Sequence, residues 1–384
     1  MLAANRPPPV GSVYAQILLV GRGMGQFHPI EPCRGRRKPR LPLRNSQHLT
    51  AKVAAMLRRF ALAALVLPVA GAAAADPPPA PPRQYVLISF DGAHDVAQWA
   101  RSRALGRRTG AHFTYFLSCV FLLSPETRTA YRAPGKAAGR SNVGFALSKA
   151  EVAARLAEIW TAHNEGHEMA SHGCGHFDGG HWSRADWLAE FAAFDRILAD
   201  AYRINAFPGE PPGWRDFAGT DIKGFRAPYL STNPALYAAL QEHRFRFDAS
   251  GVSQGPAAPL TGGPLARFAL PQIAEGPRAK PVVAMDYNLY VRHSGGAERP
   301  DEGAEFEARA YDAFQASFAA EYAGGRRPLQ IGFHFVLMNG GAYWRALERF
   351  AEAVCNRPKV ACVSYSEYLA AAAKPHPAGA GAGG

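Results

Sequence analysis

Short apolar runs alternate with longer amphipathic segments through the middle of the chain. The runs Tyr85–Phe90 and His112–Leu117 are rich in aromatic and aliphatic residues, which is typical of strands buried in a parallel sheet. Polar residues stand where such strands end, so we expect the chemistry of the protein at one edge of the sheet. Further strands are predicted at Gly224–Arg226, Phe245–Asp248, Val282–Asp286, Leu329–Phe335 and Val360–Ser364.

Helical signals separate these strands. Capping patterns at Ser148–Glu151, Ser183–Asp186 and Asn233–Pro234 each precede a predicted helix. The first of these helices should end near His163 and lead into Gly166–Ser171. Strands that alternate with helices over about 290 residues, without internal repeats, favour an α/β fold with a barrel-like sheet.

The chain from Met56 has the pattern of a secretory signal peptide. Arg58 and Arg59 precede an apolar run, Phe60–Val69, and small residues follow as far as Ala75. A run of about ten apolar residues is too short to cross a bilayer of about 30 Å as a helix. We therefore expect no stable membrane insertion after cleavage, with an uncleaved anchor as the alternative.

Residues 1–55 place this signal inside the chain rather than at its start. They are rich in Pro, Gly and Arg and show no sustained periodicity, so we predict that translation begins at Met56. A real cytoplasmic or disordered extension is the alternative. The predicted organisation is a non-native or disordered extension at 1–55, a signal peptide at 56–75, a Pro-rich linker at 76–84, the barrel at 85–370 and a disordered tail at 371–384.

The formal net charge of +12 lies mostly before the predicted barrel. Residues 1–55 contain nine bases and one acid, and the signal peptide adds two arginines. From Asp76 onward, 32 bases stand against 30 acids, so the folded part is nearly neutral. Because nucleic-acid binding needs clustered Lys and Arg on a folded surface, we expect no nucleic-acid partner.

Four cysteines remain once Cys33 in the extension is set aside. An exported signal places them in a secreted or periplasmic setting, where disulfides persist. We favour a bond between Cys355 and Cys362, which flank a short turn, and one between Cys119 and Cys174, which follow two predicted strands. Four buried free thiols are the alternative.

Two histidines near a strand end are suited to a metal ion. His172 and His176 lie four residues apart in a glycine-rich loop, which lets both imidazoles face one ion if the loop turns. Two unrelated loop histidines are the alternative, and His167 fits a core position. Asp91 ends the first strand and suits a metal ligand or a general base, unless it only forms an Asx turn with Gly92.

Two further strand ends carry polar groups in apolar surroundings. Arg226, within Gly224–Leu230, could orient a carboxylate through paired hydrogen bonds, and a nearby backbone N–H could meet an oxyanion. A simple surface turn is the competing explanation. His334, within Ile331–Phe335, is either a satisfied core histidine or a general acid opposite a metal.

Taken in chain order, these pieces resemble the NodB-like polysaccharide deacetylases. The resemblance runs from about Tyr85 to Leu369, and a few further strings are most similar to the chitin-deacetylase-like branch. Their joint order and spacing are far more specific than any single motif. The residues that carry it are Phe90–Asp91, His172–His176, Arg226–Tyr229, Phe247–Asp248 and Phe333–His334.

The resemblance implies a distorted (β/α) barrel with about seven strands and a metal-dependent hydrolysis of N-acetyl or O-acetyl groups on a glycan. The implied metal is a divalent ion, with zinc as the expected one. The implied roles are metal ligands for His172 and His176, general base for Asp91, support of Asp91 for Arg226, an oxyanion-binding backbone N–H for Tyr229, general acid for His334 and support of that acid for Asp248.

Two departures from the family pattern concern the metal site. Gly92 stands where the family usually has an aspartate that serves as the third metal ligand. We expect Asp95 to replace it if the intervening loop folds back, with His94, added waters, or loss of metal and activity as alternatives. Gly173 stands where a small hydroxyl residue is usual, which removes one supporting hydrogen bond.

The sequence therefore predicts a secreted or periplasmic carbohydrate deacetylase that acts on an acetylated glycan such as chitin or peptidoglycan. One alternative is a glycan-binding barrel that lost hydrolysis with the third ligand, and another is an amidase for a small non-sugar amide. Tyr343 and Trp344 could cover a sugar ring, but Trp344 precedes Leu347 and Phe350 at helical spacing, which favours core packing.

Overall fold

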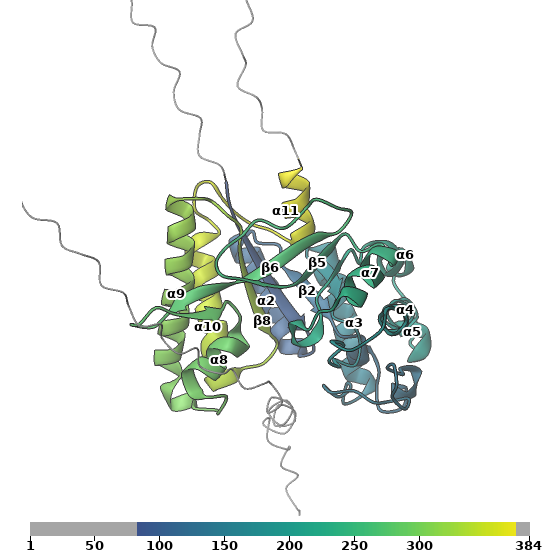
Figure 1. Cartoon of the computed structure of the whole chain (residues 1–384). Coiled ribbons are helices and arrows are strands. Elements are labelled where there is room, and N and C mark those ends of the chain that lie inside the picture. Colours follow the sequence, from purple (N-terminus) through teal and green to yellow (C-terminus); the bar gives the residue numbers. More distant parts are fainter. Residues whose placement is uncertain (1–82, 374–384) are drawn as a thin grey trace, which may run out of the picture. The chain divides into compact units, whose positions relative to one another are not determined.

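The computed structural model describes residues 83–373 (Figure 1). The predicted extension 1–55, the signal peptide and linker residues 76–82 lie outside this range, as does the tail from residue 374. The strands are β1 (Gln84–Gly92), β2 (Thr114–Leu117), β3 (Glu168–Ser171), β4 (Gly224–Phe225), β5 (Phe247–Ser253), β6 (Ala266–Glu275), β7 (Lys280–Val283), β8 (Leu329–His334) and β9 (Val360–Cys362). The α-helices are α2 (Val96–Thr109), α3 (Lys149–Asn164), α4 (Arg184–Ala199), α5 (Ala201–Ile204), α6 (Trp214–Thr220), α7 (Pro234–Glu242), α8 (Asp286–Ser294), α9 (Gly303–Ala323), α10 (Met338–Val354) and α11 (Tyr365–Ala372). Short 3₁₀ turns are η2 (Cys119–Leu122), η3 (Arg128–Ala130), η4 (Pro228–Leu230) and η5 (Pro300–Glu302).

Seven of these strands form one continuous parallel sheet, in the order β6-β5-β4-β3-β2-β1-β8. At one edge, β7 pairs antiparallel with β6, and off this path β9 pairs parallel with the first residues of β1, a strand that lies between β2 and β8. Helices connect the parallel strands, with α9 and α10 on one side of the strands and α3, α4 and α7 on the other (Figure 1). The predicted distorted (β/α) barrel is confirmed, and the total of nine strands exceeds about seven because of β7 and β9.

A two-residue segment closes the sheet between β6 and β8. The N–H of Ala284 donates to the carbonyl of Pro271 in β6, and the carbonyl of Ala284 accepts from the N–H of Gly332 in β8, both at 2.9 Å. Met285 forms a parallel bridge with Gly332. This seam leads directly into Asp286, the first residue of α8.

Strand β6 is not among the strands predicted from the sequence, and Pro271 lies within it. A proline cannot donate to a sheet and argues against a central strand. The nitrogen and the carbonyl of one strand residue point to the same side, so the missing N–H of Pro271 faces the seam, where its carbonyl accepts from Ala284. The carbonyl of Ala284 accepts from Gly332 instead, so no acceptor is left unpaired by the proline.

The predicted helix caps are present. The Ser183–Asp186 capping box is complete, and the Asn233 side chain accepts from a backbone N–H in the first turn of α7. Ser148 accepts from the N–H of Glu151, but the carboxylate of Glu151 binds the N–H of Leu147 instead of closing the box. Each cap satisfies an N–H that a helix start would otherwise leave unpaired.

Alternation along β1 separates the inside of the barrel from the outside. Ile88 and Phe90 belong to the large apolar cluster beneath the helices, whereas Leu87 belongs to a smaller cluster of residues from β1, β2, β3, β5, β6 and α11. Because side chains alternate along a strand, Ser89 and Asp91 share the face of Leu87. The last residue of this inner row is therefore a carboxylate.

The apolar core beneath the helices contains Tyr343, Trp344 and His167, for which the sequence allows either a core position or a role in the site. The ring of Trp344 stacks on Phe90 at 5.3 Å, so the core packing expected for Trp344 is confirmed, and Tyr343 is buried beside it, each residue being 1% exposed. His167 is buried against the ring of Phe113, and its Nδ1 accepts from the Phe113 N–H at 3.0 Å. It is a core histidine, as predicted.

Both expected disulfides are formed, Cys119–Cys174 and Cys355–Cys362. The first joins the turn after β2 to the loop after β3, and the second joins the end of α10 to β9. Within residues 83–373, no helix combines the length and apolar character needed to cross a membrane.

The two disulfides should contribute unequally to stability. They close loops with sequence separations of 55 and 7 residues, and a longer loop loses more entropy in the unfolded state when it is closed. We expect Cys119→Ser/Cys174→Ser to lower the free energy of unfolding by about 4 kcal/mol and Cys355→Ser/Cys362→Ser by about 2 kcal/mol. Denaturant titration of both variants measures this, and a larger loss in the second would contradict it.

Candidate active site

A buried ion pair occupies the inner end of the barrel. Arg226 follows β4 and is 0% exposed, and its Nη1 donates to Oδ1 of Asp91 at 2.7 Å and to the hydroxyl of Ser89 at 2.9 Å. Its Nε donates to the carbonyl of Ala249, and its Nη2 donates to the hydroxyl of Tyr365. The guanidinium therefore links Asp91 on β1 to β5 and α11.

This pair keeps Asp91 ionised. Burial alone would raise the pKa of the Asp91 carboxyl, but the charge and hydrogen bond of Arg226 hold that pKa below its usual value. The guanidinium also lies 4.2 Å from the centre of the Phe116 ring, which provides a favourable face for a desolvated cation. Asp91 is thus a buried carboxylate that stays able to accept a proton near neutral pH.

His172 and His176 lie together beside Asp91. Their ring centroids are 5.0 Å apart, and both rings interact electrostatically with Asp91. Burial lowers the pKa of His172 below its usual value and that of His176 to about 3. Both are neutral imidazoles, which is the form that binds metal ions.

The ring nitrogens of the two histidines are available for an ion. The Nδ1–H of His172 donates to the backbone carbonyl of Arg226 at 2.7 Å, which leaves its Nε2 lone pair unused by that bond. Nδ1 of His176 is buried, and no protein group within residues 83–373 hydrogen-bonds to it. These features fit a divalent ion held by two nitrogen ligands.

A third side-chain ligand is not brought to this pair. No three His, Cys, Asp or Glu side chains in the described part of the chain are arranged to hold a metal ion. Asp95, the expected replacement, instead caps α2 by accepting from the N–H of Gln98 at 3.0 Å. His94, the other alternative, stacks on Phe121 at 5.0 Å between ring centroids. The residues therefore supply two of the three ligands that the family resemblance implies.

A buried carboxylate that the sequence did not single out shapes the histidine loop. Glu190 on α4 accepts from the N–H of Cys174 at 2.7 Å, from the N–H of Gly175 at 3.3 Å and from the hydroxyl of Tyr131 at 2.8 Å. Cys174 is also tied to Cys119 by the disulfide. The sequence feature that could have identified Glu190 is its position as a charged residue on the apolar face of a predicted helix, beside Trp187, Phe191 and Phe194.

His334 stands opposite Asp91 at the end of the neighbouring strand. The two residues are register partners in the parallel pair of β1 and β8, where strands lie about 4.8 Å apart. Nδ1 of His334 lies 2.7 Å from Oδ1 of Asp286, and its backbone N–H donates to Oδ2 of Asp286 at 2.8 Å. Asp286 is 0% exposed, so this contact is well shielded from water.

Asp286, rather than Asp248, is the partner of His334. The side chain of Asp248 instead accepts from the hydroxyl of Ser250 at 2.5 Å, and the same hydroxyl accepts from the N–H of Ala227. The expected support of His334 by Asp248 is therefore wrong, because Asp248 lies within β5, where it pairs with residues of β4 and β6. Burial raises the pKa of Asp248 to about 6.

Asp286, which has the role expected for Asp248, directly follows the seam of Ala284 and Met285. Burial alone would lower the pKa of His334, but the charge and hydrogen bond of Asp286 raise that pKa above its usual value. The contact with Asp286 thus favours the protonated form of His334 beside an ionised Asp91. A proton donor and a proton acceptor face each other across two adjacent strands.

Tyr229 lies at the outer edge of this group. Its ring is 4.7 Å from that of His176, and the residue is 41% exposed. Tyr229 and Leu230 adopt φ angles of 60° and 54°, a conformation that costs non-glycine residues energy and that concentrates at functional sites. The oxyanion role of the Tyr229 N–H stays a prediction.

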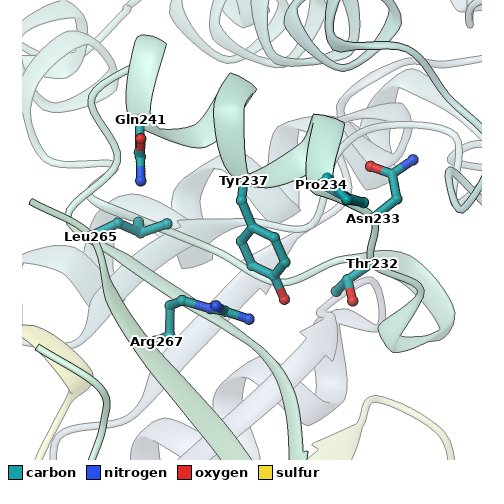
Figure 2. A pocket seen from close by; sticks show the side chains of 7 residues that line it. All are labelled: Thr232, Asn233, Pro234, Tyr237, Gln241, Leu265 and Arg267. Carbon is teal, nitrogen blue, oxygen red and sulfur yellow. The ribbon is translucent and has the colours of Figure 1, made fainter. Parts of the chain in front are cut away.

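A separate surface pocket lies outside the barrel, between α7 and β6 (Figure 2). It has a volume of about 500 Å³, and the guanidinium of Arg267 lies 3.8 Å from the centre of the Tyr237 ring within it. Its lining includes none of the charged or imidazole groups described above. The lining residues are Thr232, Asn233, Pro234, Tyr237, Gln241, Leu265 and Arg267.

No protein-family model and no curated protein matches the sequence. Solved structures that are similar to the chain include polysaccharide and peptidoglycan deacetylases. One, from Mycobacterium smegmatis and assigned to the polysaccharide deacetylases, is 16% identical, covers 76% of this chain and 91% of its own, and has a TM-score of 0.46. Another is the Xyl-CE4 domain of a multidomain xylanase from the hindgut metagenome of Trinervitermes trinervoides, at 13% identity, 76% and 91% coverage and a TM-score of 0.42.

A third is the peptidoglycan deacetylase PdaC of Bacillus subtilis, which is 10% identical over 75% of this chain and 91% of that chain, with a TM-score of 0.39. All three identities and scores are low. The barrel assignment therefore stands on the strand order given above, and the chemistry stands on the residues inside the barrel.

The ion pair of Arg226 and Asp91 should couple strongly in a double-mutant cycle. Arg226→Met leaves a buried carboxylate unpaired, so we expect it to lower the free energy of unfolding by about 3–5 kcal/mol. Asp91→Asn combined with Arg226→Met should recover part of that loss, because no buried anion remains. Denaturant titration of both single variants and the double variant measures the coupling, and additive losses would show that the two side chains are independent.

Proposed function

We propose that the protein is a hydrolase that removes acetyl groups from a glycan, with Asp91 as general base and His334 as general acid. The single observation that carries this proposal is the register pairing on β1 and β8 of Asp91, which is held by Arg226, with His334, which is held by Asp286. Deacylation needs both groups, because water must lose a proton and the leaving nitrogen or oxygen must gain one.

In this proposal Asp91 takes the proton of the attacking water. Arg226 holds the carboxylate through Oδ1, so the second oxygen is the one that faces the reactants. His334 then gives its proton to the leaving group, and Asp286 stabilises the imidazolium before that transfer. The backbone N–H of Tyr229 would stabilise negative charge on the acetyl oxygen, as the family resemblance implies.

His172 and His176 would hold a divalent ion, which we expect to be zinc. When bound, such an ion lowers the pKa of water and polarises an acetyl carbonyl. The histidine loop itself provides the orientation of both rings, through the Arg226 carbonyl on one side and Glu190 on the other. The signal pattern at 56–75 supports a secreted or periplasmic location, where acetylated glycans are the available substrates.

Removal of the base should abolish most activity without unfolding the protein. We expect Asp91→Asn to lower kcat for acetate release from acetylated oligosaccharides by a factor of about 100 or more. Asp178→Asn, which changes an exposed aspartate just after the histidine loop, is the matched control and should retain kcat. Equal kcat values for Asp91→Asn and the parent would reject Asp91 as the base.

The alkaline limb of the pH profile should report the contact between His334 and Asp286. The acid must be protonated, so kcat/KM should fall as the pH rises through the raised pKa of His334. Asp286→Asn removes the negative charge, lowers the pKa of His334 and should move this limb to lower pH. Asp248→Asn is the control, and a shift with Asp248→Asn but not with Asp286→Asn would contradict the assignment.

Metal binding should depend on the two loop histidines. We expect the purified protein to bind a divalent ion, to lose acetate release on chelation and to regain it with zinc. His176→Ala should weaken zinc binding measured by calorimetry at least tenfold, whereas His181→Ala, at an exposed histidine nearby, should not. Unchanged binding in His176→Ala would place the ion elsewhere.

A further inference from the structure

The segment after β2 carries an unusual excess of positive charge. Residues 127–150, which we call the basic loop, contain Arg128, Arg132, Lys136, Arg140 and Lys149 and no acidic residue. All five of these are exposed. This excess stands out because the chain from Asp76 onward is nearly neutral.

Hydrogen bonds to backbone carbonyls fold the basic loop into a compact unit. Nε of Arg132 donates to the carbonyl of Lys136 at 3.1 Å, and the N–H of Gly139 donates to the carbonyl of Tyr131 at 2.8 Å. Arg128 lies against Gly139, where a Cβ would be 3.3 Å from the Arg128 Cγ. The cationic side chains therefore arise from one small surface.

A further exposed cation joins this surface from a helix. Arg196 on α4 donates from Nη2 to the carbonyl of Ala130 at 2.7 Å. Carboxylates within residues 83–373 pair with many other arginines, such as Arg103 with Glu165 and Arg101 with Glu348. The structure shows no such partner, within the same residues, for Arg196 or for the five exposed cations of the basic loop.

The basic loop also touches the candidate active site. Asn142 donates from its backbone N–H to the carbonyl of Gly175 at 2.8 Å and from Nδ2 to the carbonyl of His176 at 3.2 Å. The ammonium of Lys136 lies 5.7 Å from the centre of the ring of Phe177, the residue after His176. A substrate bound at His176 would therefore extend past these cations.

We propose that the basic loop and Arg196 bind carboxylate groups of the substrate, which makes the substrate an acetylated glycan that contains uronic acid residues. This inference rests on the proposed deacetylase function. Exposed guanidinium and ammonium groups attract carboxylates, and they do so without the desolvation cost that a buried pair would carry. The position beside His176 assigns the charge to sugar units next to the acetylated one.

A polyuronate fits this surface better than a nucleic acid does. A duplex needs a broad set of cations along its phosphates, and binding weakens steeply with salt. Here the cations are confined to one loop and one helix position beside the site. Uronic acids carry one carboxylate per sugar, which a few cations at one edge of the site can match.

The test compares two acetylated substrates of equal length. O-acetylated oligogalacturonates carry carboxylates, and O-acetylated xylo-oligosaccharides do not. We expect Arg132→Gln/Lys136→Gln to raise KM for the oligogalacturonate about three- to tenfold with kcat unchanged, because these contacts would be equal in the ground and transition states. The KM and kcat for the xylo-oligosaccharide should not change. Added salt should weaken the binding of the oligogalacturonate and leave that of the xylo-oligosaccharide unaffected.

Lys223→Gln/Arg246→Gln is the charge-matched control. These exposed residues lie at the starts of β4 and β5, away from the strand ends that hold the site. We expect this control to keep the parent KM for both substrates. An equal rise of KM in both double variants would overturn the proposal, because it would show attraction by net charge alone.

Binding to a non-hydrolysing form separates this proposal from the deacetylase function. Calorimetry with Asp91→Asn should show tighter binding of the acetylated oligogalacturonate than of the xylo-oligosaccharide, and the difference should disappear with Arg132→Gln/Lys136→Gln. Preferential binding without acetate release from the parent protein would support the anionic ligand and reject the hydrolase. Equal binding of both sugars, or tighter binding of duplex DNA of matched charge, would overturn the anionic-glycan proposal.

Discussion

The contact between Arg226 and Asp91 is the interaction on which the rest of the site depends. A guanidinium inside a barrel is costly unless its donors are used, and here four of its five N–H groups donate to acceptors from β1, β5 and α11. The same residue fixes His172 through its backbone carbonyl. One side chain and one carbonyl therefore set the charge of the carboxylate and the orientation of a neighbouring imidazole. The parallel register of β1 and β8 then places His334 opposite that carboxylate.

Much of this fold could be predicted from the alternation of apolar runs and helical segments. The strand at Gln84–Gly92 and the caps at Ser148, Ser183 and Asn233 follow local rules, and the structure agrees with them. The strand β6 could not be predicted from local rules, because the cost of Pro271 depends on what faces its nitrogen, and here the carbonyl of Ala284 has another donor in Gly332. The hydrogen-bond partners around Pro271 are decided only when the sheet has formed.

The site shows the same division between local and tertiary information. Asp91, Arg226, His172 and His334 stand at strand ends and in recognisable spacings, so the sequence brings them forward as candidates. Whether Asp248 or Asp286 supports His334 depends on how β6, β7 and β8 meet, which no local pattern encodes. Glu190 offered only a charge on an apolar helix face. Asp95 was attractive for its closeness in sequence, yet a helix start needed the same oxygen.

The two-residue seam at Ala284 and Met285 has a consequence for the site. Two backbone hydrogen bonds, each 2.9 Å long, join Ala284 to β6 and β8. Both seam residues are buried, at 0% and 5% exposure, so packing as well as hydrogen bonding holds this short junction. Asp286 follows the seam directly and contacts His334. The closure of the barrel wall and the placement of the carboxylate beside His334 therefore depend on the same short segment, and a change of packing at Met285 would reach the histidine without touching it.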